Sequence, residues 1–241
     1  MLQKTEGIVL RAVKYTDTRL IVTIFTEAFG TKAYIVNASR AKKGNKNVMF
    51  YRAGMLLDLV VYERPKSSVQ RIKEAGFAYK FSDLVFNPVK TAILFFITEV
   101  LGIVVSDDQP EPEMFRFVRG LLLLLDSEKE LVHGYLYYFM IKMSRFLGFF
   151  PFGKYSDQTP IFDLANGVFR SMPPAHANYI SGTLAEQFGN LLEATPENIN
   201  QFASKPSDRL KLLEQLLVYY RLHYPTFKDV KSLEVMRQVF S

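Results

Sequence analysis

The fold is decided by the stretch EGIVLRAVKYTDTRLIVTIFTEAFGTKAYIVNA, residues 6–38. Three of its segments, 6–14, 19–27 and 32–38, are rich in Val, Ile, Thr and Tyr and partly alternate apolar with polar residues, which is typical of strands. Two further segments of this kind, 55–63 and 69–79, follow it. Five short strands in about eighty residues predict a small closed or partly closed barrel, because closure removes exposed strand edges.

After residue 80 the apolar period changes from that of strands to that of helices. Helices are predicted at 88–105, 113–126, 131–148, 183–193, 196–203, 206–223 and 229–240. The segment 149–182 holds three glycines and four prolines and is predicted to be an irregular insertion, with a type I′ hairpin turn at Asn166-Gly167. The chain is therefore predicted to be an α+β protein with two domains, 1–80 and 81–241.

Composition places the chain among globular proteins, since 49% of its 241 residues are apolar. It has no cysteine, which excludes disulfides, thiolate zinc sites and cysteine nucleophiles. Its start has no apolar segment of signal-peptide length, and its most apolar run, 91–105, is shorter than a membrane span and contains Glu99. These features predict a cytoplasmic protein.

Positive charge is concentrated in the first third. Residues 1–80 carry 15 Lys and Arg against six Asp and Glu, a net +9, whereas residues 81–241 carry a net −3. The stretch 35–54 contains four cations within seven residues and no acid; these candidate anion-binding residues are Arg40, Lys42, Lys43 and Lys46. Second candidates in the same domain are Arg11, Lys14, Arg19, Lys32 and Arg52. Such a domain suits a long polyanion or a membrane surface.

A membrane surface is the weaker choice, because it calls for a basic amphipathic helix and these cations lie mainly in predicted strands and turns. Aromatic rings near the cations could stack on unpaired bases, and Tyr15, Tyr34 and Tyr51 are available. Tyr34 and Tyr51 are more readily interpreted as barrel core. Because no pattern for reading base edges is visible, binding is predicted to be independent of sequence.

Signals for catalysis or a cofactor are absent from the sequence. The three histidines, His133, His176 and His223, are far apart and lack the spacing of metal ligands. There is no P-loop, no dinucleotide-binding glycine pattern and no nucleophile elbow. The acids near residues 107–113 alternate with prolines and are interpreted as a solvated loop. We therefore predict a protein that is not an enzyme and needs no cofactor, although an unrecognised active site is a competing hypothesis.

Three parts of the chain together resemble the bacterial RecO recombination mediators. The opening segment 5–46 is similar to that family's G-I-V-L-R strand, its turn and its basic loop. LGFFPF (147–152) is similar to a family pattern after the central helix, and HYPTFKDVKSLEVMRQV (223–239) is similar to the family's terminal segment. The resemblance thus covers both ends and the middle of the chain.

The resemblance implies an N-terminal OB-fold barrel and a C-terminal helical domain. It implies a mediator of DNA repair and recombination that binds single- and double-stranded DNA and anneals complementary strands. With RecR as a partner it would help to load RecA onto DNA coated by single-stranded DNA-binding protein, whose acidic C-terminal tail it would bind. The implied location is the cytoplasm, in association with the nucleoid.

One departure concerns zinc, because many members of the family carry a four-cysteine zinc element where this chain has 149–182. We predict a metal-free, zinc-finger-like insertion that is held together by aromatic side chains. These are Phe149, Phe150, Phe152, Tyr155, Phe162 and Phe169.

Two pairs of cations with helical i, i+3 spacing are candidates for binding the acidic tail. They are Arg116 with Arg119 and Lys142 with Arg145. Ordinary surface charges on core helices are the competing interpretation of these residues. An alternative function is that of an RNA-binding OB-fold accessory protein, which charge and stacking cannot distinguish from a DNA-binding one.

Overall fold

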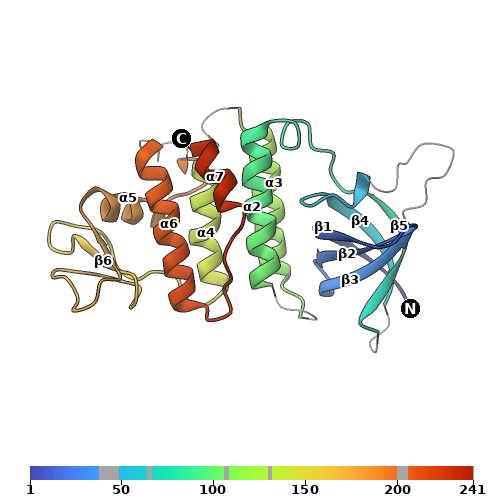
Figure 1. Ribbon diagram of the computed structural model, residues 1–241, viewed down its shortest axis with the longest axis horizontal. Coiled ribbons are helices and arrows are strands. Elements are labelled where there is room, and N and C mark those ends of the chain that lie inside the picture. The colour runs from blue at the N-terminus through green and yellow to red at the C-terminus, as the bar shows by residue number, and fades with distance from the viewer. Residues whose placement is uncertain (38–48, 64–66, 106–108, 130–131, 200–205, 241) are drawn as a thin grey trace. The chain divides into compact units, whose positions relative to one another are not determined.

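The computed structural model describes residues 1–37, 49–63, 67–105, 109–129, 132–199 and 206–240 (Figure 1). The chain forms two compact units, Met1–Asp126 and Ser127–Ser241. The first unit takes in the barrel and the two helices that follow it, so it reaches well beyond residue 80. A domain boundary at residue 80 stays a prediction.

The first unit begins with a closed five-stranded barrel. Its strands are β1 (Leu2–Thr16), β2 (Arg19–Thr26), β3 (Gly30–Asn37), β4 (Leu56–Tyr62) and β5 (Val69–Phe77). They follow the order β1-β2-β3-β5-β4, and antiparallel pairing of β1 with β4 closes the ring. Pairing of β3 with β5 is parallel and spans only Ala33–Ile35 against Val69–Arg71. The predicted OB-like barrel is confirmed.

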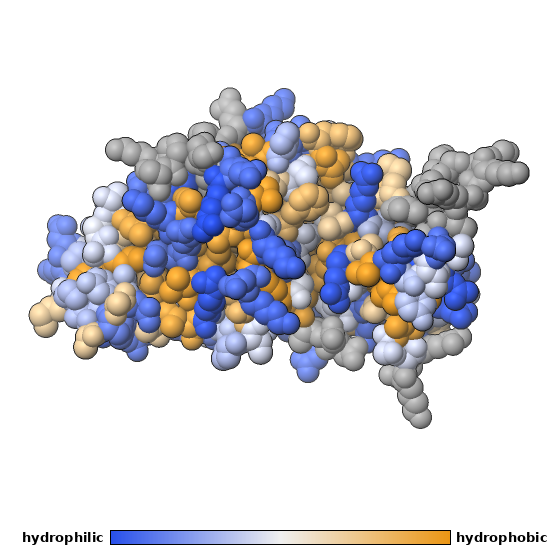
Figure 2. Space-filling view, viewed as in Figure 1, coloured by the Kyte–Doolittle hydropathy of each residue, from blue (hydrophilic) through white to orange (hydrophobic). Residues whose placement is uncertain are grey.

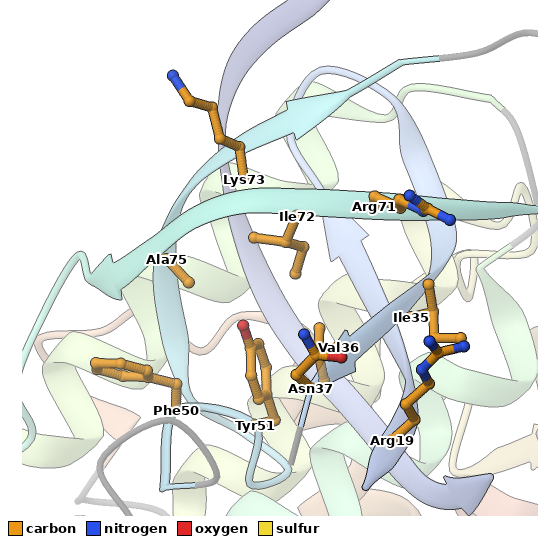
Figure 3. A pocket seen from close by; sticks show the side chains of 10 residues that line it. All are labelled: Arg19, Ile35, Val36, Asn37, Phe50, Tyr51, Arg71, Ile72, Lys73 and Ala75. Carbon is orange, nitrogen blue, oxygen red and sulfur yellow. The ribbon is translucent and has the colours of Figure 1, made fainter. Parts of the chain in front are cut away.

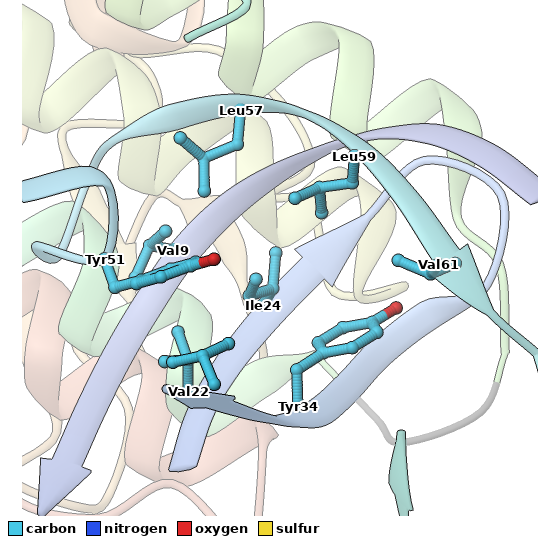
Figure 4. Packing of buried hydrophobic residues seen from close by; sticks show 9 residues of the cluster. Val9, Val22, Ile24, Tyr34, Tyr51, Leu57, Leu59 and Val61 are labelled. Atoms are coloured by element: carbon cyan, nitrogen blue, oxygen red, sulfur yellow. The ribbon is translucent and has the colours of Figure 1, made fainter. Parts of the chain in front are cut away.

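Inward-facing side chains of all five strands, together with Tyr51, fill the barrel (Figure 4). Tyr34 is completely buried and Tyr51 is 8% exposed, so the prediction that both are core residues is confirmed. Burial raises the pKa of both phenols, and the charge of Glu63 raises that of Tyr34 further. Other hydrophobic residues reach the surface, as Figure 2 shows in orange for one face.

Two helices complete the first unit. Helix α2 (Pro88–Val104) begins at Pro88, the first residue of the predicted helix. The Asn87 side chain caps it by accepting hydrogen bonds from the amides of Val89 and Lys90. Helix α3 (Pro112–Ser127) carries Glu113 in its first turn, where the helix dipole favours an acid.

The end of α3 is joined to the segment before α2 through one buried carboxylate. Asp126 is 3% exposed and accepts hydrogen bonds from the backbone amides of Ser82, Asp83 and Leu84 at 2.7–3.1 Å. Lys90, 1% exposed, donates to the Asp126 carbonyl at 3.0 Å and lies 2.8 Å from the Asp83 carboxylate. This cluster fixes the chain where it leaves the barrel.

The second unit combines helices with a small sheet. Its elements are α4 (Gly134–Phe146), β6 (Ile161–Asp163), β7 (Val168–Arg170), β8 (Tyr179–Ser181), α5 (Gly182–Leu192), α6 (Pro206–His223) and α7 (Leu233–Phe240). The three strands form an antiparallel sheet in the order β7-β6-β8. Of the predicted helix at 196–203, residues 196–198 form a turn and Ile199 is in 3-10 conformation; the rest of it lies outside the described residues.

The predicted hairpin at Asn166-Gly167 is present, but its turn was predicted wrongly. Asp163 pairs with Val168, which leaves a loop of four residues rather than two. The buried Asp163 carboxylate accepts hydrogen bonds from the amides of Ala165 and Asn166 and therefore favours the longer loop.

Four of the six predicted aromatic side chains of the insertion, Phe149, Tyr155, Phe162 and Phe169, pack against other aromatic rings. Phe162 is completely buried, and its ring centroid lies 4.3 Å from that of Phe188 and 5.7 Å from that of Tyr219. Phe169 lies against Phe162 as well, at 4.9 Å. The prediction was wrong for Phe152, whose side chain is 77% exposed, because only its backbone joins the sheet.

Candidate nucleic-acid interface

A depression of about 470 Å³ lies where β3 and β5 separate (Figure 3). Their parallel pairing ends at Ile35 and Arg71, and β5 then continues against β4 alone. Tyr51 lies in the gap beneath β5, with its hydroxyl directed toward that strand. The lining residues are Arg19, Ile35, Val36, Asn37, Phe50, Tyr51, Arg71, Ile72, Lys73 and Ala75.

A second depression, of about 360 Å³, adjoins the first on the outer face of the barrel. It is lined by Tyr15, Ile21, Ile35, Tyr62, Ser67, Val69, Gln70 and Arg71. The two depressions adjoin at Ile35 and Arg71, which line both, and together we call them the groove. This groove lies over β2 and β3 and beside the β1–β2 and β4–β5 turns, where OB folds bind oligonucleotides.

The groove is electropositive. Arg19, Arg71 and Lys73 line it, and among the described residues of its lining there is no acid. Within the described parts of the chain, no ion pair joins Arg19 or Arg71 to a carboxylate. Lys73 lies 3.4 Å from Glu74, and both side chains are solvent-exposed, so this pair is weak. The two guanidinium groups are therefore available to an anion.

Two β-bulges determine the positions of two groove residues, Lys73 and Tyr15. The register of β5 against β4 shifts around Lys73, and that of β1 against β2 shifts around Tyr15. A bulge adds one residue to a strand and turns a side chain out of the regular alternation, which is why bulges occur beside functional sites. In Figure 3 the Lys73 side chain extends away from the gap, on the outer side of β5.

A different part of the barrel surface is acidic. Glu6, Asp58 and Glu74 line a separate depression over β1, β4 and β5, together with Lys4. The groove cations thus lie on β2 and β5 and these acids on β1, β4 and β5, where Glu6 is paired with Arg119 and Glu74 lies 3.4 Å from Lys73.

The first-choice residues Arg40, Lys42, Lys43 and Lys46 lie outside the described residues. They belong to the connection between β3 and β4, which leaves β3 at Asn37, a residue of the groove. Their role in binding stays a prediction.

Among the second choices, the structure places only Arg19 in the groove lining. Arg11 lies on the same outer face and donates a hydrogen bond to Thr23 at 3.2 Å. Lys14 lies 2.6 Å from Asp17 and pairs with Leu20, which packs against the core, so it lies on the other side of the sheet.

Two further second choices also lie away from the groove. Lys32 pairs with the core residue Ile24 and therefore lies on the inner side of β3. Arg52 lines a separate apolar cavity of about 410 Å³, with Lys80 as the only other charged residue in the lining that the structure describes.

Sequence reasoning missed Arg71, Lys73 and Tyr62. The signal for the two cations was present. They stand two residues apart in the predicted strand 69–79, and residues at this spacing share one face of a strand. Tyr62 gave no signal, since its place at the groove depends on its pairing with Arg71 across β4 and β5.

The candidate tail-binding cations are held by other groups. Arg116 lies 2.9 Å from Glu27, and Arg119 lies 2.6 Å from Glu6, so both tie α3 to the barrel. In the second unit, the Lys142 ammonium lies 5.3 Å from the centre of the Tyr138 ring, and burial followed by the Arg145 charge lowers its pKa.

The fourth of these cations, Arg145, is exposed and lies over the Phe150 ring at 4.3 Å. Binding of a partner by these four residues stays a prediction. Their existing contacts show that each also has a structural role.

The described residues contain no group of three or more His, Asp or Glu side chains arranged to hold a metal ion. His223 lies 2.8 Å from the Leu164 carbonyl and stacks on Phe149. Burial lowers the pKa of His133, and the nearby Arg209 charge adds to the effect. None of the helices in the described ranges combines the length and the apolarity that crossing a membrane requires.

Comparison with known proteins accounts for the whole length of the chain. Residues 1–81 match the family model for the N-terminal part of recombination protein O, and residues 85–234 match that for its C-terminal part. Curated relatives named DNA repair protein RecO include those of Bacteroides fragilis, 32% identical, and Phocaeicola vulgatus, 30% identical, each over 241 residues and 100% of both chains. That of Flavobacterium psychrophilum is 30% identical over 99% of both chains. The chain belongs to the RecO family.

Proposed function

We propose that this protein is a mediator of DNA repair and recombination that binds DNA through the groove of its barrel. It binds single- and double-stranded DNA without sequence specificity, anneals complementary strands, and acts with RecR to load RecA onto DNA coated by single-stranded DNA-binding protein. The family relationship supports the repair role. The observation that supports the binding site is a groove whose described lining contains Arg19, Arg71 and Lys73 and no acid.

Phosphates are the natural ligands of these cations. Guanidinium groups form paired, charge-assisted hydrogen bonds with phosphate oxygens, and no carboxylate in the described part of the chain forms an ion pair with Arg19 or Arg71. Each neutralised phosphate releases counterions, so binding weakens as salt rises. Contacts to phosphate position a strand without reading its bases, which accounts for binding that is independent of sequence.

The proposed mediator works through binding rather than catalysis, and its place is the cytoplasm and the nucleoid. Its protein partners are RecR and the acidic tail of single-stranded DNA-binding protein. Arg145, exposed on α4, is the most accessible of the predicted tail-binding cations, although it already covers Phe150.

RNA is the alternative ligand, because the groove offers RNA the same cations and rings. Competition between DNA and RNA oligonucleotides of one sequence separates the two. The DNA proposal expects DNA to compete at least as well as RNA, and a clear preference for RNA contradicts it.

The double variant Arg19→Ala/Arg71→Ala tests the groove. Because it removes two guanidinium groups from the groove, we expect about tenfold weaker binding of a labelled dT oligonucleotide. The slope of log affinity against log salt should become shallower by about 1.4 units, the value for two lost phosphate contacts on a single strand. Fluorescence anisotropy across a salt series measures both.

The matched control is Lys4→Ala/Lys211→Ala, which removes two exposed cations outside the groove. It is expected to bind like the wild type. If the groove variant keeps the affinity and the salt slope of the wild type, the groove is not the DNA site.

A second variant, Lys42→Ala/Lys43→Ala/Lys46→Ala, tests the connection that leaves β3 beside the groove. If these lysines contact three phosphates, the salt slope falls by up to about two units. Binding that matches the wild type in affinity and slope would show that this connection is only a solvated turn.

A further inference from the structure

The apolar cavity of about 410 Å³ that Arg52 and Lys80 line lies within the first unit, apart from the groove. Three segments form its walls: residues 49–55, which lead into β4, residues 77–81, at the end of β5, and residues 85–95, which lead into α2 and form its first two turns. Its volume falls in the range of cavities that bind ligands, about 300–1,000 Å³. The cavity therefore has room for several side chains of a partner.

Large apolar side chains at this cavity are exposed to solvent. Phe86 is 76% exposed, Met49 is 54% exposed and Phe95 is 48% exposed, and all three line the cavity. Leu94, next to Phe95 in α2, is 1% exposed and belongs to the core. The cavity thus has a buried floor and an exposed apolar rim, and apolar surface gathered in this way marks a place where a partner binds.

The wall between the cavity and the barrel is fixed. Gly54 has a φ of +84°, and a Cβ at this position would lie 2.6 Å from atoms of the Leu94 side chain. The Gly54 amide donates to the Val9 carbonyl at 2.7 Å, and the Met55 amide donates to the Arg52 carbonyl at 3.1 Å. These contacts hold the wall against both α2 and β1. A cavity that is formed in advance costs less entropy to fill.

Two cations complete the lining. Arg52 and Lys80 are exposed, and they belong to different connections, one before β4 and one after β5. The described lining contains no acid, and no ion pair in the described part of the chain joins either cation to a carboxylate. A ligand that complements this surface combines apolar groups with carboxylates.

A nucleic-acid strand fits this lining poorly. Its uncharged polar side chains, among the described residues, are Thr91 and Tyr79. The Thr91 hydroxyl donates to the Leu84 carbonyl at 2.9 Å, and the Tyr79 hydroxyl donates to Asp126 at 3.3 Å. Because both donors are already used, a base in the cavity would bury polar edges without partners. The methionines of the lining, in contrast, can adapt to side chains of different shapes.

A second copy of this chain is also a poor occupant. A symmetric dimer brings the same patch of both copies together. Arg52 and Lys80 of one copy would then lie near the same two cations of the other, and the described lining supplies no acid between them. Like charges brought together at an interface oppose association.

From these observations we infer that the cavity is a docking site for a peptide segment of a partner protein in which aromatic or aliphatic side chains stand beside carboxylates. The apolar side chains enter between Phe86 and Phe95, and the carboxylates meet Arg52 and Lys80. The described lining includes none of the four cations predicted to bind an acidic tail. The inference does not rest on DNA binding by the groove.

An array of short synthetic peptides tests the chemistry of the ligand. Its classes are acidic with apolar residues, acidic without them, basic with apolar residues, and uncharged with apolar residues. Fluorescently labelled full-length protein is expected to bind the first class most strongly. Equal binding to the two acidic classes would show attraction by charge alone and would overturn the inference, as would no binding to any class.

The peptide that binds best is then labelled and titrated by fluorescence anisotropy. Phe95→Ala is expected to weaken binding about tenfold or more, because aromatic anchors carry much of the affinity of an interface. Arg52→Ala/Lys80→Ala is expected to weaken it about fivefold and to reduce its dependence on salt. Phe152→Ala is the matched control, an exposed phenylalanine of the second unit, and should bind like the wild type. All four side chains are exposed, so the core is not disturbed.

Unchanged peptide binding in Phe95→Ala overturns the inference, because the peptide then lies elsewhere. Equal weakening by Arg19→Ala/Arg71→Ala also overturns it, since the peptide would then occupy the groove. Light scattering after size-exclusion chromatography examines the remaining occupant. A dimer of the wild type that Phe95→Ala dissociates would make a second copy the occupant, and would contradict the inference as well.

Binding of the dT oligonucleotide is measured on the same proteins and separates this inference from the proposed function. Phe95→Ala is expected to bind DNA as the wild type does. A clear loss of DNA affinity in this variant would assign the cavity to nucleic acid and overturn the inference. Failure of the wild type to bind the oligonucleotide overturns the proposed function and leaves the peptide result standing.

Discussion

Asp126→Ala is expected to lower the free energy of unfolding of the first unit by about 3–5 kcal/mol, because it leaves several buried donors without an acceptor. The carboxylate accepts from the amides of Ser82, Asp83 and Leu84 and from the Ser82 hydroxyl. Alanine can replace none of these bonds. Urea denaturation followed by circular dichroism measures the loss.

The control for this variant is Asp58→Ala, which removes an exposed carboxylate of the same unit. It should change stability by less than about 0.5 kcal/mol. Equal losses in the two variants would contradict a special role for the Asp126 cluster.

The effect of Asp126 depends on pH in a defined direction. Burial raises the pKa of this carboxyl, but hydrogen bonds from the Leu84, Asp83 and Ser82 amides outweigh it and bring the pKa below the ordinary value of 3.8. The stabilisation is therefore fully present above the unfolded pKa and is lost as pH falls through the folded pKa. The difference between wild type and Asp126→Ala should be largest near neutral pH and should shrink below about pH 4.

Phe162→Ala is expected to destabilise the second unit by about 3–5 kcal/mol. The ring is completely buried and lies against Phe169, Phe188 and Tyr219, so truncation leaves a large cavity. The sheet β7-β6-β8 should lose its order first, because Phe162 is the middle residue of its central strand. Thermal denaturation and amide hydrogen exchange of this sheet measure both effects.

Phe152→Ala is a matched control, since it removes the same side chain from an exposed position of the same insertion. It should leave the melting temperature within about 1 °C of the wild type. A chelator should leave both proteins unchanged if aromatic packing, rather than a metal, holds the insertion. A drop in melting temperature on adding the chelator would contradict that account.

The barrel could be predicted from sequence because its signals are local. Alternation of apolar residues and turn residues at short intervals identified the five strands, and the same alternation identified Tyr34 as core. The groove could be predicted only in part. Arg19 was found through charge, whereas the gap beside Arg71 arises because β3 and β5, far apart in the chain, pair over three residues and then separate.

The roles of Arg116 and Arg119 were hidden for the same reason. Their spacing correctly placed them on one side of a helix, but their partners Glu27 and Glu6 lie 89 and 113 positions away. A helical pattern shows that two side chains share a face, but not which surface that face meets. The Asp126 cluster could not be predicted either, because an acid at the end of an apolar helix is typical of solvent exposure.

The short parallel contact between β3 and β5 also affects how the barrel folds and how stable its closed form is. It spans only three residue pairs, whereas the antiparallel pairing of β1 with β4 spans seven, so it should reopen before the antiparallel pairs do. A strand of DNA that contacts Arg19 on β2 and Arg71 on β5 would bridge this seam. DNA binding would then stabilise the closed barrel, and the stabilisation would increase with the occupancy of the ligand.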